Sequence, residues 1–157
     1  ARPLAVDIDA SRLAMARDLG AEVCSANEQL TAAIHDLTAG EGVPLVIEAT
    51  GNPRAMEQSV ELVAAGGRIV IVGLVKQGLG VTFPGLDLTR KELTIVGSRA
   101  SANCFPEAIE LLAANRLRLP ETIERLALEH APEIFRRLGE NPASKRKGVF
   151  VNQVLVA

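Results

Sequence analysis

The chain has 157 residues, 48% of them hydrophobic and 23% charged, which is enough for one globular domain with a real core. Its net charge of −2 excludes a basic face for a phosphate backbone. Only 3% of the residues are aromatic, with no Trp or Tyr, which excludes a stacking platform for bases, so we expect no nucleic-acid partner. The apolar runs are too short to span a membrane, no secretory leader opens the sequence and the two cysteines are isolated, so we expect a cytoplasmic protein without a membrane partner.

Apolar runs and helical patterns alternate along the first 115 residues. Five short runs rich in Val, Ile and Leu are typical of strands buried on both faces of a parallel sheet: 3–7, 21–25, 44–49, 68–73 and 93–98. The apolar spacing between them predicts four helices: 11–19, 27–38, 53–65 and 106–115. This order predicts the α/β class, with an open, doubly wound and mostly parallel sheet.

The last 40 residues have a different character. They predict a strand over 121–130, a short helix over 131–140 and a strand over 148–156. The segment 140–148 is polar and contains Pro, Gly and several charges, which indicates a solvated loop. Because three consecutive residues of this segment are cations, a phosphate-binding basic patch is the alternative interpretation.

The first strand ends on Asp7, and an amphipathic helix follows at once. In dinucleotide-binding folds, an acid at the end of the fold's second strand accepts hydrogen bonds from the adenosine ribose. Asp7 sits at the corresponding point, as the last residue of an apolar strand just before a helix. A carboxylate there also repels a 2′-phosphate, which favours NAD over NADP, and Arg12 lies near enough along the chain to reach the same ribose or its phosphate. The alternative interpretation is that Asp9 or Ser11 caps the helix while Asp7 is merely solvated.

Three further strand ends carry glycine or polar residues. The strand 44–49 runs into the turn Thr50–Gly51, and the next two strands end at Gly73 and Gly97. Ligands of open α/β sheets lie at the carboxyl ends of the strands, and glycine permits a close approach of backbone to ligand. The alternative is that these glycines serve only the conformation of a sharp turn.

Together these segments resemble the cofactor-binding half of the zinc-dependent medium-chain dehydrogenases. The similarity extends over nearly the whole chain and is closest to the polyol and sugar-acid branch, which includes sorbitol and threonine dehydrogenases. Four stretches carry it: DIDASRLAMARDLGAEV, VIEATGNP, AAGGRIVIVG and LTIVGSRASANCFPEAIELL.

The resemblance implies a Rossmann-like fold and gives cofactor-binding roles to ten residues. Asp7 matches the acid that binds the adenosine ribose, and Arg12 matches the basic residue beside it. Thr50 and Gly51 match the turn that lines the adenosine and nicotinamide pocket. Six residues match two backbone stretches that face the nicotinamide, its ribose and its amide: Val72, Gly73, Leu74, Gly97, Ser98 and Arg99.

Two parts of the family pattern are not found in this sequence. The Gly-rich phosphate loop and its strand should precede Asp7 by roughly 20 residues, but only six residues do so. The catalytic zinc ligands of the family belong to an N-terminal domain, and His35 and His130 here are isolated. We therefore expect a C-terminal piece of a larger enzyme, with a partial dinucleotide-binding domain at 1–120 and a segment at 121–157 that returns to the catalytic domain.

The resemblance implies that the parent enzyme uses zinc and NAD to oxidise a small-molecule alcohol, polyol or sugar acid. The piece alone is expected to be inactive and to bind NAD weakly or not at all, because the pyrophosphate site is missing. Two other interpretations are a non-catalytic α/β assembly domain and a regulatory domain that binds an adenosine ligand.

The strand that is not found lies at the centre of the sheet in this topology, between the second and fourth strands. Without it we expect the sheet to divide and to expose two unpaired edges. A neighbouring chain or the segment 148–156 would have to fill the gap, and for this reason we expect a homo-oligomer.

Overall fold

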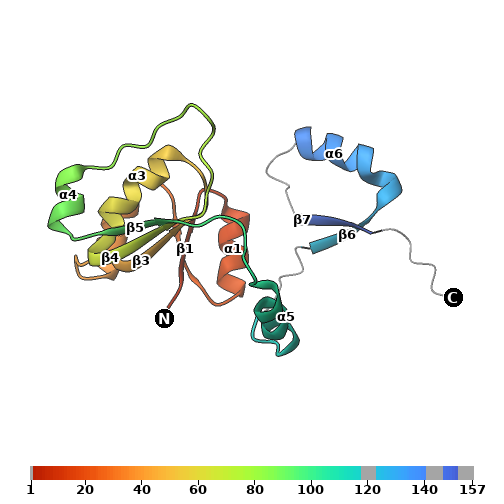
Figure 1. Ribbon diagram of the computed structural model, residues 1–157, viewed down its shortest axis with the longest axis horizontal. Helices are drawn as coiled ribbons and strands as arrows, with labels where there is room; N and C mark the ends of the chain where they lie inside the picture. The colour runs from red at the N-terminus through yellow and green to blue at the C-terminus, as the bar shows by residue number, and fades with distance from the viewer. Residues whose placement is uncertain (1, 118–122, 141–146, 152–157) are drawn as a thin grey trace. The chain divides into compact units, whose positions relative to one another are not determined.

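The computed structural model describes residues 2–117, 123–140 and 147–151 (Figure 1). The chain divides into two compact units, one formed by Ala1–Val23 with Asn103–Ala157 and the other by Cys24–Ala102. The first unit contains β1 (Leu4–Asp7), α1 (Ala10–Asp18), α5 (Phe105–Ala113), β6 (Ile123–Ala127), the 3₁₀ turn η1 (Leu128–His130), α6 (Ala131–Glu140) and β7 (Lys147–Val151). The second contains α2 (Leu30–Leu37), β3 (Val43–Glu48), α3 (Pro53–Leu62), β4 (Val63–Ile71), α4 (Gly85–Arg90) and β5 (Thr94–Gly97), and β2 (Glu22–Ser25) spans the boundary.

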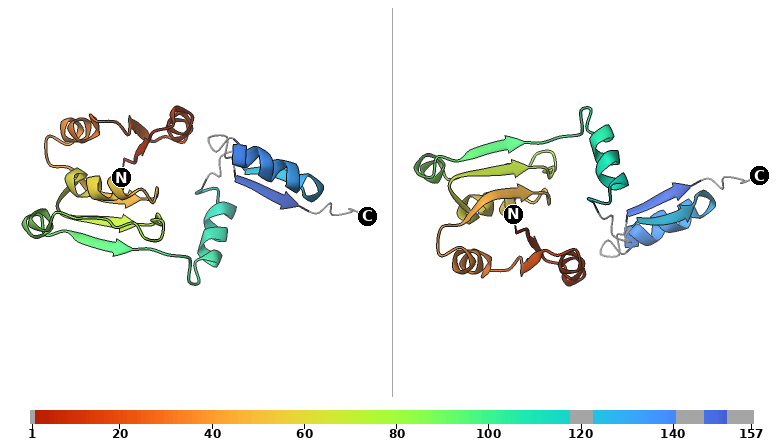
Figure 2. Two further views of the ribbon diagram at one scale, coloured as in Figure 1. Left: turned by 90° about the horizontal axis from the view of Figure 1, so that it is seen from above. Right: turned by 90° about the horizontal axis from the view of Figure 1, so that it is seen from below.

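The described strands form three separate sheets. β1 pairs with β2, β3–β4–β5 form a parallel three-stranded sheet, and β6 pairs with β7 in parallel. Figure 2 shows β3, β4 and β5 side by side. Among the described strands, β1–β2 and β3–β4–β5 are thus separate sheets, in agreement with the expected division of the sheet. The described part of the segment 148–156 pairs with β6, whereas residues 152–156 lie outside the described residues.

The core of the second unit lies between α3 and one face of the three-stranded sheet. Val60 of α3 and Val63 and Ile69 of β4 are almost completely buried, and six partly buried side chains pack against them: Val46, Ile71, Phe83, Leu88, Leu93 and Ile95. The register aligns Val46 with Ile69 and Ile69 with Ile95, so one residue from each strand contributes to this layer. The apolar runs of the sequence thus form a parallel sheet in the predicted α/β fold.

The opposite face of this sheet is less covered than the sequence predicts. Leu45 and Ile47 of β3 are 49% and 63% exposed, and Val96 of β5 is 39% exposed. Ile47 and Val96 both align with Val70 of β4, so these three side chains share one face. The expectation that the strands are buried on both faces is wrong for β3 and β5, because no helix of the second unit covers this side.

Two helix boundaries differ from the predicted ones. α2 begins at Leu30 rather than at residue 27, because the Asn27 side chain accepts a hydrogen bond from the Gln29 N–H (2.9 Å) in a preceding turn. α3 ends at Leu62 rather than at residue 65, because Val63 is already extended and aligns with Val43 of β3.

The C-terminal elements agree with the predicted order. α6 has the predicted bounds. Of the strand predicted over 121–130, residues 123–127 form β6 and residues 128–130 form the turn η1, whereas 121 and 122 lie outside the described residues. Most of the predicted loop at 140–148 lies outside the described residues. No helix in the part of the chain that the structure describes is long and apolar enough to cross a membrane.

Candidate functional site

The carboxyl ends of β3, β4 and β5 bring three of the predicted segments together. The Glu48 carbonyl at the end of β3 accepts hydrogen bonds from the N–H groups of Val72 (2.8 Å) and Gly73 (3.0 Å), which follow β4. The Ile71 carbonyl accepts a hydrogen bond from the Ser98 N–H (2.8 Å), which follows β5. The three strand ends are therefore joined by backbone hydrogen bonds beyond the last residues of the strands.

Two glycines allow the turns after β3 and β4 to touch. A Cβ atom on Gly73 would collide with the Gly51 backbone nitrogen and would lie 2.8 Å from the Gly51 Cα. A Cβ atom on Gly51 would collide with the Leu74 carbonyl oxygen, and Gly51 also has φ = 72°. Gly51 is thus required both by its positive φ and by contact, so the interpretation that it serves only the turn conformation is insufficient.

Glu48 is a buried carboxylate at this strand end that the sequence analysis did not single out. It is 5% exposed, and its Oε1 atom accepts hydrogen bonds from the Thr50 N–H (2.8 Å) and from the Thr50 hydroxyl. Its Oε2 atom accepts a longer hydrogen bond from the Gly51 N–H (3.4 Å). The available signal was a carboxylate at the end of an otherwise apolar strand, but its burial depends on the neighbouring strand.

A series of hydrogen bonds connects Glu48 to the start of α3. The Thr50 hydroxyl, which donates to Glu48, accepts from the Asn52 N–H (3.0 Å). The Asn52 side chain in turn accepts from the Arg54 N–H (2.9 Å) and caps the helix. Hydrogen bonds of the Glu48, Thr50 and Asn52 side chains therefore hold the turn between β3 and α3.

Several of the predicted residues at these strand ends are accessible. Val72 and Leu74 are 44% and 68% exposed, and Gly97, Ser98 and Arg99 are also exposed. The Ser98 N–H bonds to the Ile71 carbonyl, whereas the hydroxyl of Ser98 and the guanidinium of Arg99 form no hydrogen bond within the described residues.

Asp7 and Asp9, in the first unit, have different partners. Asp9 caps α1 by accepting hydrogen bonds from the Ser11 N–H (2.8 Å), the Ser11 hydroxyl (2.6 Å) and the Arg12 N–H (3.4 Å). The Ser11 hydroxyl, followed by the Ser11 N–H, holds the pKa of Asp9 below its usual value of 3.8. Asp7 accepts from the Asp9 N–H (2.9 Å) and pairs with the Arg12 guanidinium (3.4 Å), so it does not cap the helix.

The described residues provide no metal centre. They contain no group of three or more His, Cys, Asp or Glu side chains that is placed to hold an ion. His35 is exposed on α2, and the Nε2 atom of His130 lies 3.7 Å from the Oε1 atom of Glu129.

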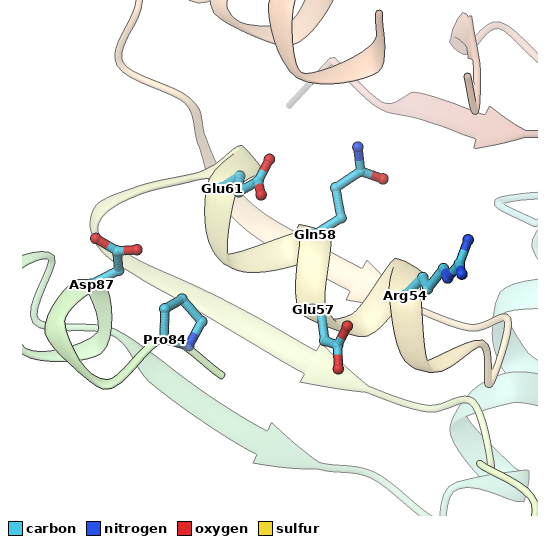
Figure 3. Close-up of a pocket in the computed structure, with 6 residues that line it drawn as sticks. All are labelled: Arg54, Glu57, Gln58, Glu61, Pro84 and Asp87. Carbon is cyan, nitrogen blue, oxygen red and sulfur yellow. The ribbon is translucent and has the colours of Figure 1, made fainter. Parts of the chain in front are cut away.

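An open groove lies between α3 and the start of α4. Arg54, Glu57, Gln58, Glu61, Pro84 and Asp87 line it (Figure 3). Two of its carboxylates are already engaged, because Glu57 accepts from the Thr82 N–H (2.8 Å) and Glu61 accepts from the Thr31 hydroxyl (3.1 Å). None of the predicted site residues lines this groove.

Residues 1–114 match the profile of a protein family described as zinc-binding dehydrogenase. The chain belongs to this family. It is 31% identical over 148 residues to an uncharacterized zinc-type alcohol dehydrogenase-like protein from Haemophilus influenzae, a match that covers 92% of this chain and 43% of the relative. It is 33% identical over 134 residues to sorbitol dehydrogenase from Gallus gallus, with 82% of this chain and 37% of the relative covered.

Solved structures of the zinc-binding dehydrogenase fold match over the same extent. An oxidoreductase/dehydrogenase of unknown specificity from Escherichia coli superposes with a TM-score of 0.87 at 28% identity, covering 97% of this chain and 44% of the other. Two chains that show the fold alone were solved with cofactors. One, from Escherichia coli CFT073, holds NADH and superposes with a TM-score of 0.84 at 22% identity, covering 96% of this chain and 44% of the other. The second, from Sinorhizobium meliloti 1021, holds NADP and superposes with a TM-score of 0.76 at 23% identity, covering 98% of this chain and 43% of the other.

The chain spans about two fifths of the length of these relatives, from 37% to 44%.

Proposed function

We propose that this chain is the cofactor-binding portion of an NAD-dependent, zinc-type dehydrogenase that oxidises a small-molecule alcohol, polyol or sugar acid. The observation that carries the proposal is the junction of the three strand ends, where Gly51 and Gly73 bring two turns into contact at the carboxyl edge of a parallel sheet. This edge is where ligands of open α/β sheets bind. Membership of the zinc-binding dehydrogenase family supports the reaction class.

The residues at this edge of the second unit suit the nicotinamide end of a dinucleotide, and two residues of the first unit suit the adenosine ribose. Thr50 and Gly51 line the adenosine and nicotinamide pocket. Val72, Gly73 and Leu74 face the nicotinamide, and Gly97, Ser98 and Arg99 hold its ribose and amide. Asp7 and Arg12 bind the adenosine ribose, and the Asp7 carboxylate disfavours a 2′-phosphate. Bound NAD supplies the hydride acceptor, and the chain's own residues orient it.

Zinc does not fit the described residues, because they include no ligand cluster. We propose that another part of the complete protein holds the ion, that residues 1–120 are a partial dinucleotide-binding domain, and that residues 121–157 return to the catalytic domain. On this proposal the 157-residue chain alone is inactive and binds NAD weakly. The names of relatives such as sorbitol dehydrogenase support a polyol or related alcohol as substrate, and we further propose a cytoplasmic homo-oligomer.

The test is the cofactor preference of the complete natural protein that carries this sequence. Steady-state kinetics should show a preference for NAD, and Asp7→Ser should lower kcat/KM for NAD about tenfold or more, because a hydrogen bond to a charged group is worth roughly 1.5–3 kcal/mol. Asp9→Asn is the matched control, since it changes the neighbouring acid but keeps a capping side chain. A wild-type preference for NADP would contradict the role given to Asp7.

A further inference from the structure

Glu48, the last residue of β3 at the proposed cofactor site, is a buried carboxylate without a cationic partner among the described residues. Glu48 is 5% exposed, and no Lys or Arg among the described residues forms an ion pair with it. Its partners are the N–H and hydroxyl of Thr50 and the N–H of Gly51. Burying a carboxylate costs free energy unless hydrogen bonds compensate it, and these three donors provide that compensation at the strand end.

The same residue also fixes the neighbouring strand end. Its carbonyl accepts from the N–H groups of Val72 and Gly73, while its Oε2 atom lies 2.8 Å from the position that a Gly73 Cβ would occupy. The side chain of Glu48 thus holds the turn after β3, and its backbone holds the turn after β4. No other described residue makes hydrogen bonds to both turns.

We infer that Glu48 is a positioning residue of the cofactor site, which acts through Thr50–Gly51 and Gly73–Leu74 to hold the nicotinamide end of the dinucleotide. This inference rests on the proposed function. The role requires a carboxylate rather than an amide, because both carboxylate oxygens accept hydrogen bonds whereas a glutamine presents one acceptor and one donor group. In Glu48→Gln, the NH₂ group faces either the Thr50 or the Gly51 N–H, and the turn has to shift.

The experiment compares two ligands on the complete natural protein. NADH contains the nicotinamide, whereas ADP-ribose contains the adenosine end and lacks the nicotinamide. Glu48→Gln should weaken NADH binding about tenfold, which is the lower range for loss of a hydrogen bond to a charged group. ADP-ribose binding should fall less than NADH binding does, because Gly73 and Leu74 face the nicotinamide, which ADP-ribose lacks.

Lys91→Met is the control for general loosening of the sheet. Lys91 donates hydrogen bonds to carbonyls at the opposite, amino end of β4, so its loss should lower stability and leave the affinity for NADH unchanged. Unchanged NADH binding in Glu48→Gln, or equal losses for NADH and ADP-ribose, would overturn the inference alone. A wild-type protein that binds neither ligand would overturn the proposed function and this inference with it.

A second pair of variants covers the case in which Glu48→Gln does not fold. Thr50→Ser keeps the hydroxyl that donates to Glu48, and Thr50→Val removes it at nearly constant volume. Thr50→Val should bind NADH severalfold more weakly than Thr50→Ser, with a smaller difference between the two variants in ADP-ribose binding. Equal NADH affinities of the two variants would overturn the inference.

Discussion

Two acids at the end of β1 illustrate how neighbouring residues take separate tasks. Asp9 satisfies N–H groups at the start of α1, which have no partner within the helix. Asp7 instead accepts from the Asp9 N–H and pairs with Arg12, and the side chains of Asp7 and Arg12 are 27% and 53% exposed. The capping role of Asp9 and the ribose-binding role proposed for Asp7 therefore do not compete for one carboxylate.

The cap predicts a pH-dependent stability. Asp9→Ala should lower the urea midpoint of unfolding, whereas Asp9→Asn should keep it close to wild type because Asn is also a good cap. The pKa of Asp9 is lowered in the folded state, so its contribution is complete above the unfolded value of 3.8 and is lost as the pH falls below 3.8 through the lowered pKa. A difference between wild type and Asp9→Ala that does not decrease as the pH falls below 3.8 would contradict this account.

Ala39 has an unfavourable backbone conformation at the end of α2. Its φ is 53°, in the left-handed region that costs residues with a Cβ roughly 1–2 kcal/mol. We predict that Ala39→Gly raises the free energy of unfolding by up to about 1 kcal/mol. The same substitution within the helix, Ala32→Gly, should lower it by about 1 kcal/mol. Urea unfolding of both variants checks the prediction, and two changes of the same sign would refute it.

At the level of the elements, the junction of α3 and β4 is closed by a residue from outside both. The Lys91 ammonium donates to the carbonyls of Val60 (2.8 Å), Val63 (3.0 Å) and Glu61 (3.3 Å). The last carbonyls of a helix have no partner within it, and a cation there also interacts favourably with the helix dipole. Lys91 therefore allows α3 to end and β4 to begin without an intervening loop.

Two substitutions of Lys91 distinguish the contribution of its charge to stability from that of its side-chain packing. Lys91→Met keeps a side chain of similar length, so we expect a loss of about 2 kcal/mol in the free energy of unfolding from the lost charged hydrogen bonds. Lys91→Arg keeps the charge and should lose less. Urea denaturation measures both, and a Lys91→Met protein as stable as the wild type would show that water replaces these bonds without cost.

The local pattern of the sequence predicts most elements but not this junction. The apolar runs and the capping residues place β1, α1, β5 and α6 within a residue or two. The end of α3 is missed because Val63 aligns with Val43, a contact across 20 positions that no local pattern encodes. Glu48 is missed as a site residue for the same reason, since its burial and its role depend on the strand that follows.

On the scale of the whole chain, the three-stranded sheet has an open edge and an apolar face. β3 pairs only with β4 among the described strands, so its other edge has no strand partner there. Leu45 and Ile47 remain exposed on the face that α3 does not cover. An exposed apolar face next to an unpaired edge favours association with another chain.

We therefore predict that a preparation of the 157-residue chain self-associates as its concentration rises. Ile47→Ser should shift the association to higher concentration, because Ile47 is 63% exposed on the sheet face and its replacement removes apolar area that a partner would bury. Leu37→Ser is the matched control, since Leu37 is 59% exposed but lies on α2. Light scattering over a dilution series distinguishes the two variants. Equal shifts would show that any exposed apolar residue drives association, and a chain that stays monomeric at high concentration would show that the sheet face and the β3 edge attract no partner.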